Sequence, residues 1–134
     1  MASIEKNLTR NQRLVLDALV SAGEPLGAYA ILDHLRNDGF RAPLQVYRAL
    51  DKLLQNGRVH RLESLNAFVA CSHEKGHKPG LVAFAICDDC GKVSEFSART
   101  VRNWLQAWAK RQGFSPRSTV LEIRGACDAC APDA

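Results

Sequence analysis

Apolar side chains recur every three or four residues in the first part of the chain, in three segments that each end at a glycine. These segments cover residues 9–23, 27–39 and 41–57. A stripe of this period predicts an amphipathic helix, and glycine commonly follows the last helical residue. Thr9 and Gln12 have the spacing of a capping box, so the first helix should begin there. We therefore predict three short helices joined by brief connections.

Two runs with the composition of β-strands follow the third segment. They are RVHRLES and NAFVAC, and they flank a turn near Ser64 and Leu65, which predicts a hairpin. Three helices and a hairpin make a winged helix-turn-helix domain, whose third helix would enter a major groove of DNA. An ordinary solvated helix face would explain the same polar pattern. The polar face of the third helix consists of Gln45, Tyr47, Arg48, Asp51, Lys52 and Gln55.

The rest of the chain has the pattern strand, strand, helix, strand. The nearly continuous apolar run LVAFAIC predicts a buried strand. A unit of this size has a marginal core, which a structural metal or dimerisation would support. We expect an α+β chain with an N-terminal winged-helix domain at 1–72, a linker at 73–80 and a small α/β domain at 81–134. The predicted elements of that domain are LVAFAIC, KVSEF, the helix ARTVRNWLQAWAKRQG with Val101, Trp104, Leu105 and Trp108 on one side, and STVLEIRG.

Composition narrows the class of protein. No run of about 18 apolar residues is present, so no membrane span is expected, and the polar N-terminus lacks the core of a signal peptide. These features predict a cytoplasmic protein, in which clustered cysteines are more often metal ligands or redox groups than disulfides. The formal net charge of +4 permits nucleic-acid binding without demonstrating it.

Four of the five cysteines form two C-x-x-C motifs, each at the end of a predicted strand. They are Cys87 with Cys90 and Cys127 with Cys130. Two such motifs brought together give the four-thiolate shell that suits structural zinc. A redox C-x-x-C would normally open a helix, so we favour zinc over a redox pair or unligated thiols. A closed shell of four thiolates leaves no position for catalysis.

The fifth cysteine, Cys71, lies beside two histidines in VACSHEKGH. If the hairpin turns at Ser64 and Leu65, His60 pairs with Val69 and becomes a diagonal neighbour of Cys71, within reach of a shared ion. His73 and His77 follow in a loop, and Glu95 could supply an oxygen. Zinc accepts such a mixed set of nitrogen, sulfur and oxygen ligands. A buried thiol and a satisfied strand histidine would explain the residues equally well.

With these residues in view, the chain resembles the ferric uptake regulator (Fur) family, in its zinc-sensing (Zur) branch. The segments that carry the resemblance are LTRNQRLVLDAL, AYAILDHLR, VYRALDKLLQNGRVHRLESLNAFVAC, ICDDCGKVSEF and CDAC. The resemblance implies a homodimer with a C-terminal dimerisation domain. It also implies that the zinc-loaded dimer binds palindromic double-stranded operator DNA and represses zinc-uptake genes.

The resemblance also implies roles for particular residues. It implies two zinc ions per chain, one structural and one regulatory. The regulatory ligands would be His60, Cys71, Glu95 and one loop histidine, for which we choose His77 over His73 because the family's ligand comes late in the loop. Base contacts would come from Tyr29 and Arg48, with Tyr47 and Gln45 in support. The region SHEKGH lacks the histidine-rich stretch of iron-sensing relatives, which disfavours iron sensing.

Two functions other than a zinc-responsive repressor would use some of the same residues. The first is a metal-dependent redox or peroxide sensor on the same scaffold, in which Cys71 would be oxidised. The second is a zinc enzyme with a small-molecule substrate, which we do not expect. The chain contains no H-E-x-x-H motif, and its histidines and glutamates lack the spacing of a zinc deaminase.

Overall fold

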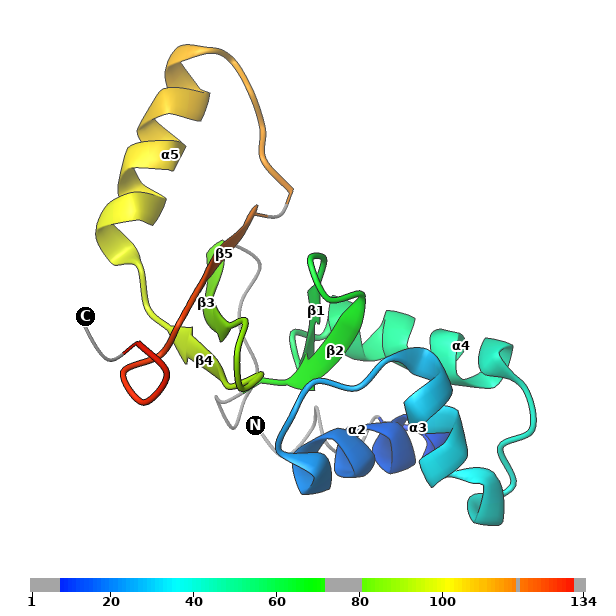
Figure 1. Cartoon of the computed structure of the whole chain (residues 1–134). Coiled ribbons are helices and arrows are strands. Elements are labelled where there is room, and N and C mark those ends of the chain that lie inside the picture. The colour runs from blue at the N-terminus through cyan, green and yellow to red at the C-terminus, as the bar shows by residue number, and fades with distance from the viewer. Residues whose placement is uncertain (1–7, 72–80, 118, 132–134) are drawn as a thin grey trace. The chain divides into compact units, whose positions relative to one another are not determined.

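The computed structural model describes residues 8–71, 81–117 and 119–131. The chain divides into two compact units, Met1–Lys78 and Pro79–Ala134. Figure 1 labels the helices and strands of both. The first unit is a winged helix-turn-helix domain and the second is a small α/β domain, so the predicted fold class is confirmed. Among the described residues, no helix has the length and apolar character needed to cross a membrane.

The N-terminal unit begins with the predicted capping box. The Thr9 side chain accepts a hydrogen bond from the Gln12 backbone N–H at 3.2 Å, and the Gln12 side chain accepts one from the Thr9 N–H at 3.1 Å. Gly23, with a φ of 64°, ends the helix in the left-handed conformation. The elements of the unit are α2 (Arg10–Ala22), α3 (Ala28–His34), η1 (Arg36–Asp38), α4 (Pro43–Gln55), β1 (Val59–Leu62) and β2 (Ala67–Ala70).

The second helix is shorter than the sequence pattern predicts. The α-helix α3 ends at His34, and the chain continues as the short 3-10 helix η1 before Gly39 ends it with a φ of 96°. Hydrogen bonds three residues apart, from Asp38 to Leu35 and from Gly39 to Arg36, tighten this last turn. The tighter turn is followed directly by Phe40, which is only 2 % exposed.

One apolar core holds the helices and the wing together. The strands β1 and β2 pair antiparallel, with His60 opposite Val69 as predicted. Leu26, before α3, exchanges backbone hydrogen bonds with Phe68 of β2 at 2.8 and 3.0 Å, which ties the helical part to the wing. The buried core consists of Val15, Leu16, Leu19, Leu26, Ala28, Ile31, Leu32, Leu35, Phe40, Val46, Ala49, Leu50, Leu53, Val59 and Phe68.

The C-terminal unit is a three-stranded sheet with one helix. Its elements are β3 (Leu81–Cys87), β4 (Val93–Phe96), α5 (Arg99–Arg111) and β5 (Thr119–Gly125). The apolar strand β3 is central, and it pairs antiparallel with β4 and parallel with β5. The parallel register places Cys87 opposite Gly125, so β3 and β5 end at the same edge of the sheet.

The helix α5 is poorly covered within its own unit. Figure 1 shows it standing apart from the strands, and it has no extensive packing against them. Its predicted apolar side is largely exposed, with Trp104 at 62 % and Trp108 at 42 %. Ala109 is the buried residue of this helix among those described. The sequence pattern therefore identified the apolar face of α5, and the described residues of the chain leave most of that face exposed.

Candidate metal centre and nucleic-acid interface

The four paired cysteines meet at one edge of the C-terminal sheet. Cys87 is the last residue of β3, and Cys127 follows β5 by two residues. All four sulfur atoms lie within 4.8 Å of one another. None of the five cysteines forms a disulfide. The parallel pairing of β3 with β5 is what brings the two distant motifs together.

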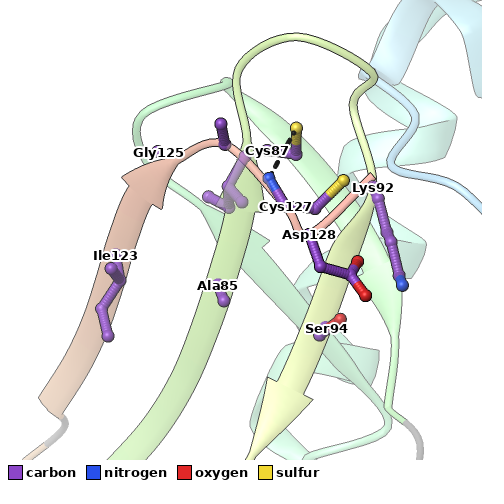
Figure 2. Close-up of a pocket in the computed structure, with 10 residues that line it drawn as sticks. Ala85, Cys87, Lys92, Ser94, Ile123, Gly125, Cys127 and Asp128 are labelled. Carbon is purple, nitrogen blue, oxygen red and sulfur yellow. Dashed lines mark hydrogen bonds between the residues drawn. The ribbon is translucent and has the colours of Figure 1, made fainter. Parts of the chain in front are cut away.

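Backbone geometry shapes this four-cysteine cluster. The Sγ of Cys87 accepts hydrogen bonds from the backbone N–H of Cys127 at 3.3 Å and from that of Cys90 at 3.4 Å. Figure 2 shows the first of these as a dashed line from the Cys127 nitrogen. Gly91 closes the first motif with a φ of 79°, a conformation that favours glycine. The four sulfur atoms therefore lie close enough together to share one ion.

The separation of the sulfur atoms fits a metal ion better than a covalent bond. The Sγ atoms of Cys90 and Cys127 are 3.8 Å apart, whereas a disulfide bond is about 2.05 Å long. In tetrahedral zinc sites the Zn–S distance is about 2.3 Å, which places neighbouring sulfur atoms about 3.8 Å apart. The donor set and its spacing therefore suit zinc.

The protonation of the cluster also bears on metal binding. The backbone N–H of Cys127, together with that of Cys90, stabilises the Cys87 thiolate and lowers the pKa of Cys87 to about 6. The side chains of Cys127 and Cys87 raise the pKa of Cys130 to about 12. One thiolate thus discourages ionisation of its neighbours. A bound divalent cation would allow all four thiols to ionise together.

The surroundings of the cluster support its geometry and leave it open to solvent. Arg124 of β5 contacts the Asp88 carboxylate through two nitrogen atoms, at 2.8 and 2.9 Å, which links β5 to the first cysteine motif. A hollow of about 300 Å³ adjoins the cluster, with Lys92, Ser94 and Asp128 among its lining (Figure 2). Cys90 is exposed, so an ion can approach from solvent.

His60 and Cys71 come together in the N-terminal unit. His60 is only 8 % exposed, and its ring nitrogen and the Cys71 sulfur lie within 4.8 Å of each other. The Cys71 backbone N–H donates to the Arg58 carbonyl at 2.8 Å, which extends the hairpin by one pair. Burial of a histidine beside a thiol is compatible with a shared metal ion.

The other predicted regulatory ligands come from residues outside the hairpin. Glu95 belongs to the C-terminal unit, where it lies on β4 opposite Phe84 and is partly buried. His73 and His77 lie outside the described residues.

The predicted DNA-binding residues lie on α3 and α4. Tyr29, the second residue of α3, is 68 % exposed, and Tyr47 and Arg48 are exposed on α4. The Gln45 side-chain oxygen accepts hydrogen bonds from the backbone N–H groups of Arg41 and Ala42, at 2.6 and 3.0 Å. Gln45 therefore caps α4, and its amide NH₂ remains to donate to a ligand.

A polar hollow that the sequence analysis did not predict lies between the start of α2 and α4. It has a volume of about 270 Å³, and its lining consists of Thr9, Asn11, Gln12, Gln45, Arg48 and Ala49. Asn11 is brought beside Arg48 only by the packing of the two helices, so no local sequence signal could have identified it. Leu44, exposed in the first turn of α4, was also absent from the predicted interface.

A winged helix-turn-helix joined to a domain with a four-thiol cluster defines a class of DNA-binding metalloprotein. A sequence model of the ferric uptake regulator family matches residues 6–124, and the chain belongs to this family.

Relatives within the family place the chain near regulators named for zinc. The chain is 41 % identical over 121 residues to the zinc uptake regulation protein of Escherichia coli (strain K12), which covers 89 % of this chain and 70 % of that protein. A crystal structure of holo XcZur is similar at 46 % identity and a TM-score of 0.84, covering 93 % of this chain and 86 % of that one. A zinc uptake regulator solved with zinc and DNA is 36 % identical at a TM-score of 0.87, covering 98 % and 92 % of the two chains.

Proposed function

We propose that this protein is a zinc-responsive transcriptional repressor, which binds palindromic operator DNA as a zinc-loaded homodimer and represses zinc-uptake genes. The observation that carries the proposal is the similarity over nearly the whole chain to a regulator solved with both zinc and DNA. The same similarity favours this function over the redox-sensing alternative. A regulatory role, without chemistry on a small-molecule substrate, is part of the proposal.

Two zinc ions per chain would serve separate purposes. The four-cysteine cluster would hold the structural ion, as its sulfur spacing and its closed donor set suggest. His60, Cys71, Glu95 and His77 would hold the regulatory ion, with His73 as the other candidate for the last ligand. Support for this second site comes from the proximity of buried His60 to Cys71.

The regulatory ion would work by linking parts of the chain. Its ligands come from the hairpin, from the proposed linker at 73–80 and from the domain at 81–134. Binding free energy at such a site would favour one arrangement of the winged-helix domain, at 1–72, relative to the other domain. Zinc would thereby control whether the two reading helices of a dimer match the half-sites of an operator.

The C-terminal domain would form the dimer interface. Its helix α5 presents Val101, Trp104 and Trp108 to solvent at 41 to 62 % exposure. Burying this face against a second copy would remove it from water and complete a core that is small in one chain. Among the described residues of this unit, the large apolar side chains that are exposed are Phe96, Val101, Trp104, Trp108, Phe114, Val120 and Ile123.

DNA binding would use the exposed ends of α3 and α4. Arg48 can donate two hydrogen bonds to guanine O6 and N7 in the major groove. Tyr29 would make a further base contact, and Tyr47 and Gln45 would support them. The capping role of Gln45 would also keep the first turn of α4 rigid in the groove.

The test combines metal content with DNA binding. Native mass spectrometry after mild chelation should show one retained zinc per chain, and a second should return on titration with zinc. Fluorescence anisotropy with a duplex selected by the zinc-loaded protein should show binding only when the second zinc is present. Equal DNA affinity at one and two zinc ions per chain would overturn the proposed switch.

A further inference from the structure

Leu44 occupies an unusual position on the proposed DNA-reading helix. It is the second residue of α4, and 56 % of its surface is exposed. Successive helix residues are about 100° apart, so Leu44 points away from Val46 and Leu53, which are fully buried. A large apolar side chain therefore lies on the outermost line of this helix, where a polar residue would be expected.

The neighbours of Leu44 are the residues proposed to contact bases. Tyr47 and Arg48 follow at three and four residues, which places them beside Leu44 on the same face. Both are exposed, and so is Asp51 one further turn along. In helix-turn-helix proteins the N-terminal residues of the reading helix contact base edges. Leu44 lies in that first turn, nearer the helix start than Arg48.

The first turn of α4 is also held in a fixed geometry. Gln45 caps it through two hydrogen bonds to the backbone, and Pro43 occupies its first position. Fixed backbone geometry gives the Cα–Cβ bond of Leu44 a defined direction, which helps a contact that distinguishes one base from another.

The chemistry of leucine limits what this side chain could read. It neither donates nor accepts a hydrogen bond, and the apolar group at the base edges of the major groove is the C5-methyl of thymine. We propose that Leu44 is a specificity-determining residue that contacts the methyl group of one thymine in each operator half-site. This inference rests on the proposed function, because it requires α4 to enter the major groove.

The experiment removes the methyl group without changing any hydrogen bond. A duplex is selected by the zinc-loaded full chain from a random-sequence library, and each thymine is then replaced in turn by deoxyuridine. Affinities are measured by fluorescence anisotropy for the parent protein, for Leu44→Ala and for Leu44→Met. Val20→Ala is the matched control, because Val20 is an aliphatic residue of α2 with 62 % exposure.

We expect one thymine per half-site at which replacement by deoxyuridine weakens the affinity of the parent protein about fourfold. A change of this size corresponds to the burial of one methyl-sized group. The same replacement should leave the affinity of Leu44→Ala unchanged. Leu44→Met keeps an apolar side chain of similar length, so its affinity should still fall when this thymine is replaced. The control variant Val20→Ala should show the same loss as the parent protein.

Other results would overturn the inference in distinguishable ways. A thymine penalty that persists in Leu44→Ala but disappears in Tyr47→Ala would assign the methyl contact to the tyrosine. Equal affinity for all deoxyuridine duplexes would mean that no thymine methyl is read. Failure to select any duplex in the presence of zinc would overturn the proposed function itself, and the inference with it.

Discussion

Replacing Cys90 by serine separates the proposed metal-binding role of the four-cysteine cluster from ordinary packing. Cys90 is exposed, whereas Cys87 is only 5 % exposed and accepts two backbone hydrogen bonds. Cys90→Ser therefore removes one sulfur ligand from the edge of the cluster without opening a cavity. We expect this substitution to destabilise the C-terminal unit.

The size of the expected destabilisation follows from the length of the loop between the two cysteine motifs, which a shared ion would cross-link. Cys87 and Cys127 are 40 residues apart, and a cross-link across a loop of that length stabilises a fold by about 4 kcal/mol. A unit of this size has a total stability of about 3–8 kcal/mol at typical values per residue. Complete loss of the cross-link through the cluster would thus remove half or more of the free energy of unfolding of this unit. The destabilisation by Cys90→Ser should therefore be at most about 4 kcal/mol.

The assay can observe the two units separately. Both tryptophans, Trp104 and Trp108, belong to the C-terminal unit, and both tyrosines, Tyr29 and Tyr47, belong to the N-terminal unit. Urea unfolding followed by tryptophan fluorescence should shift to lower urea in Cys90→Ser, while the far-ultraviolet signal of the N-terminal helices persists.

Two controls tie the expected shift to the metal. Strong chelation of the parent protein should reproduce the shift, and the mutation should then have no further effect. Cys71→Ser, in the other unit, should leave the tryptophan transition in place. An unchanged tryptophan transition in Cys90→Ser, with zinc retained, would refute the structural role that we assign to the cluster.

Further predictions concern the DNA contacts, the regulatory site and the dimer. Arg48→Ala should lose about 1–3 kcal/mol of discrimination at one G·C pair, measured by anisotropy on single-base variants, and a uniform loss across variants would contradict base readout. Cys71→Ser should keep the zinc of the cluster but weaken zinc-dependent DNA binding; full repression in cells would argue against the site. Trp104→Ala should weaken the dimer by about 2 kcal/mol or more in sedimentation experiments, and unaltered dimer dissociation would place the interface elsewhere.

Local patterns predicted most of the elements of the fold. The capping box at Thr9, the strand at Leu81–Cys87 and the pairing of His60 with Val69 are all present. These features depend on residues that are close together in the sequence, so the sequence displays them directly. The second helix was predicted too long, because its last turn is the 3-10 helix η1, and an apolar stripe does not distinguish the two helix types at a helix end.

In the candidate sites, too, the features that depend on sequence spacing were predicted, and those that depend on tertiary packing were not. The C-x-x-C spacing and the place of each pair at the end of a predicted strand indicated that four cysteines would meet, and the parallel pairing of β3 with β5 brings them together. They are Cys87, Cys90, Cys127 and Cys130. The capping by Gln45 was not predicted, because it depends on how a side chain folds back at a helix start. Leu44 was not included in the predicted interface, although the helical period places it on the outer face of α4. The exposure of α5 was also unpredicted, because an apolar stripe does not specify which surface covers it.

The parallel pairing of β3 with β5 also has a consequence for how the chain folds. The edge of β3 that pairs with β5 stays unpaired until the ribosome has synthesised β4, α5 and then β5, because β5 begins only at Thr119. Contacts between such distant segments form slowly, whereas the N-terminal unit is built largely from neighbouring helices. During that delay the sequence LVAFAIC, apolar and without charge or proline, has an open strand edge of the kind that pairs with other chains. Early capture of zinc by the cysteines at and just beyond the ends of β3 and β5 would shorten this interval and so protect newly made protein from aggregation.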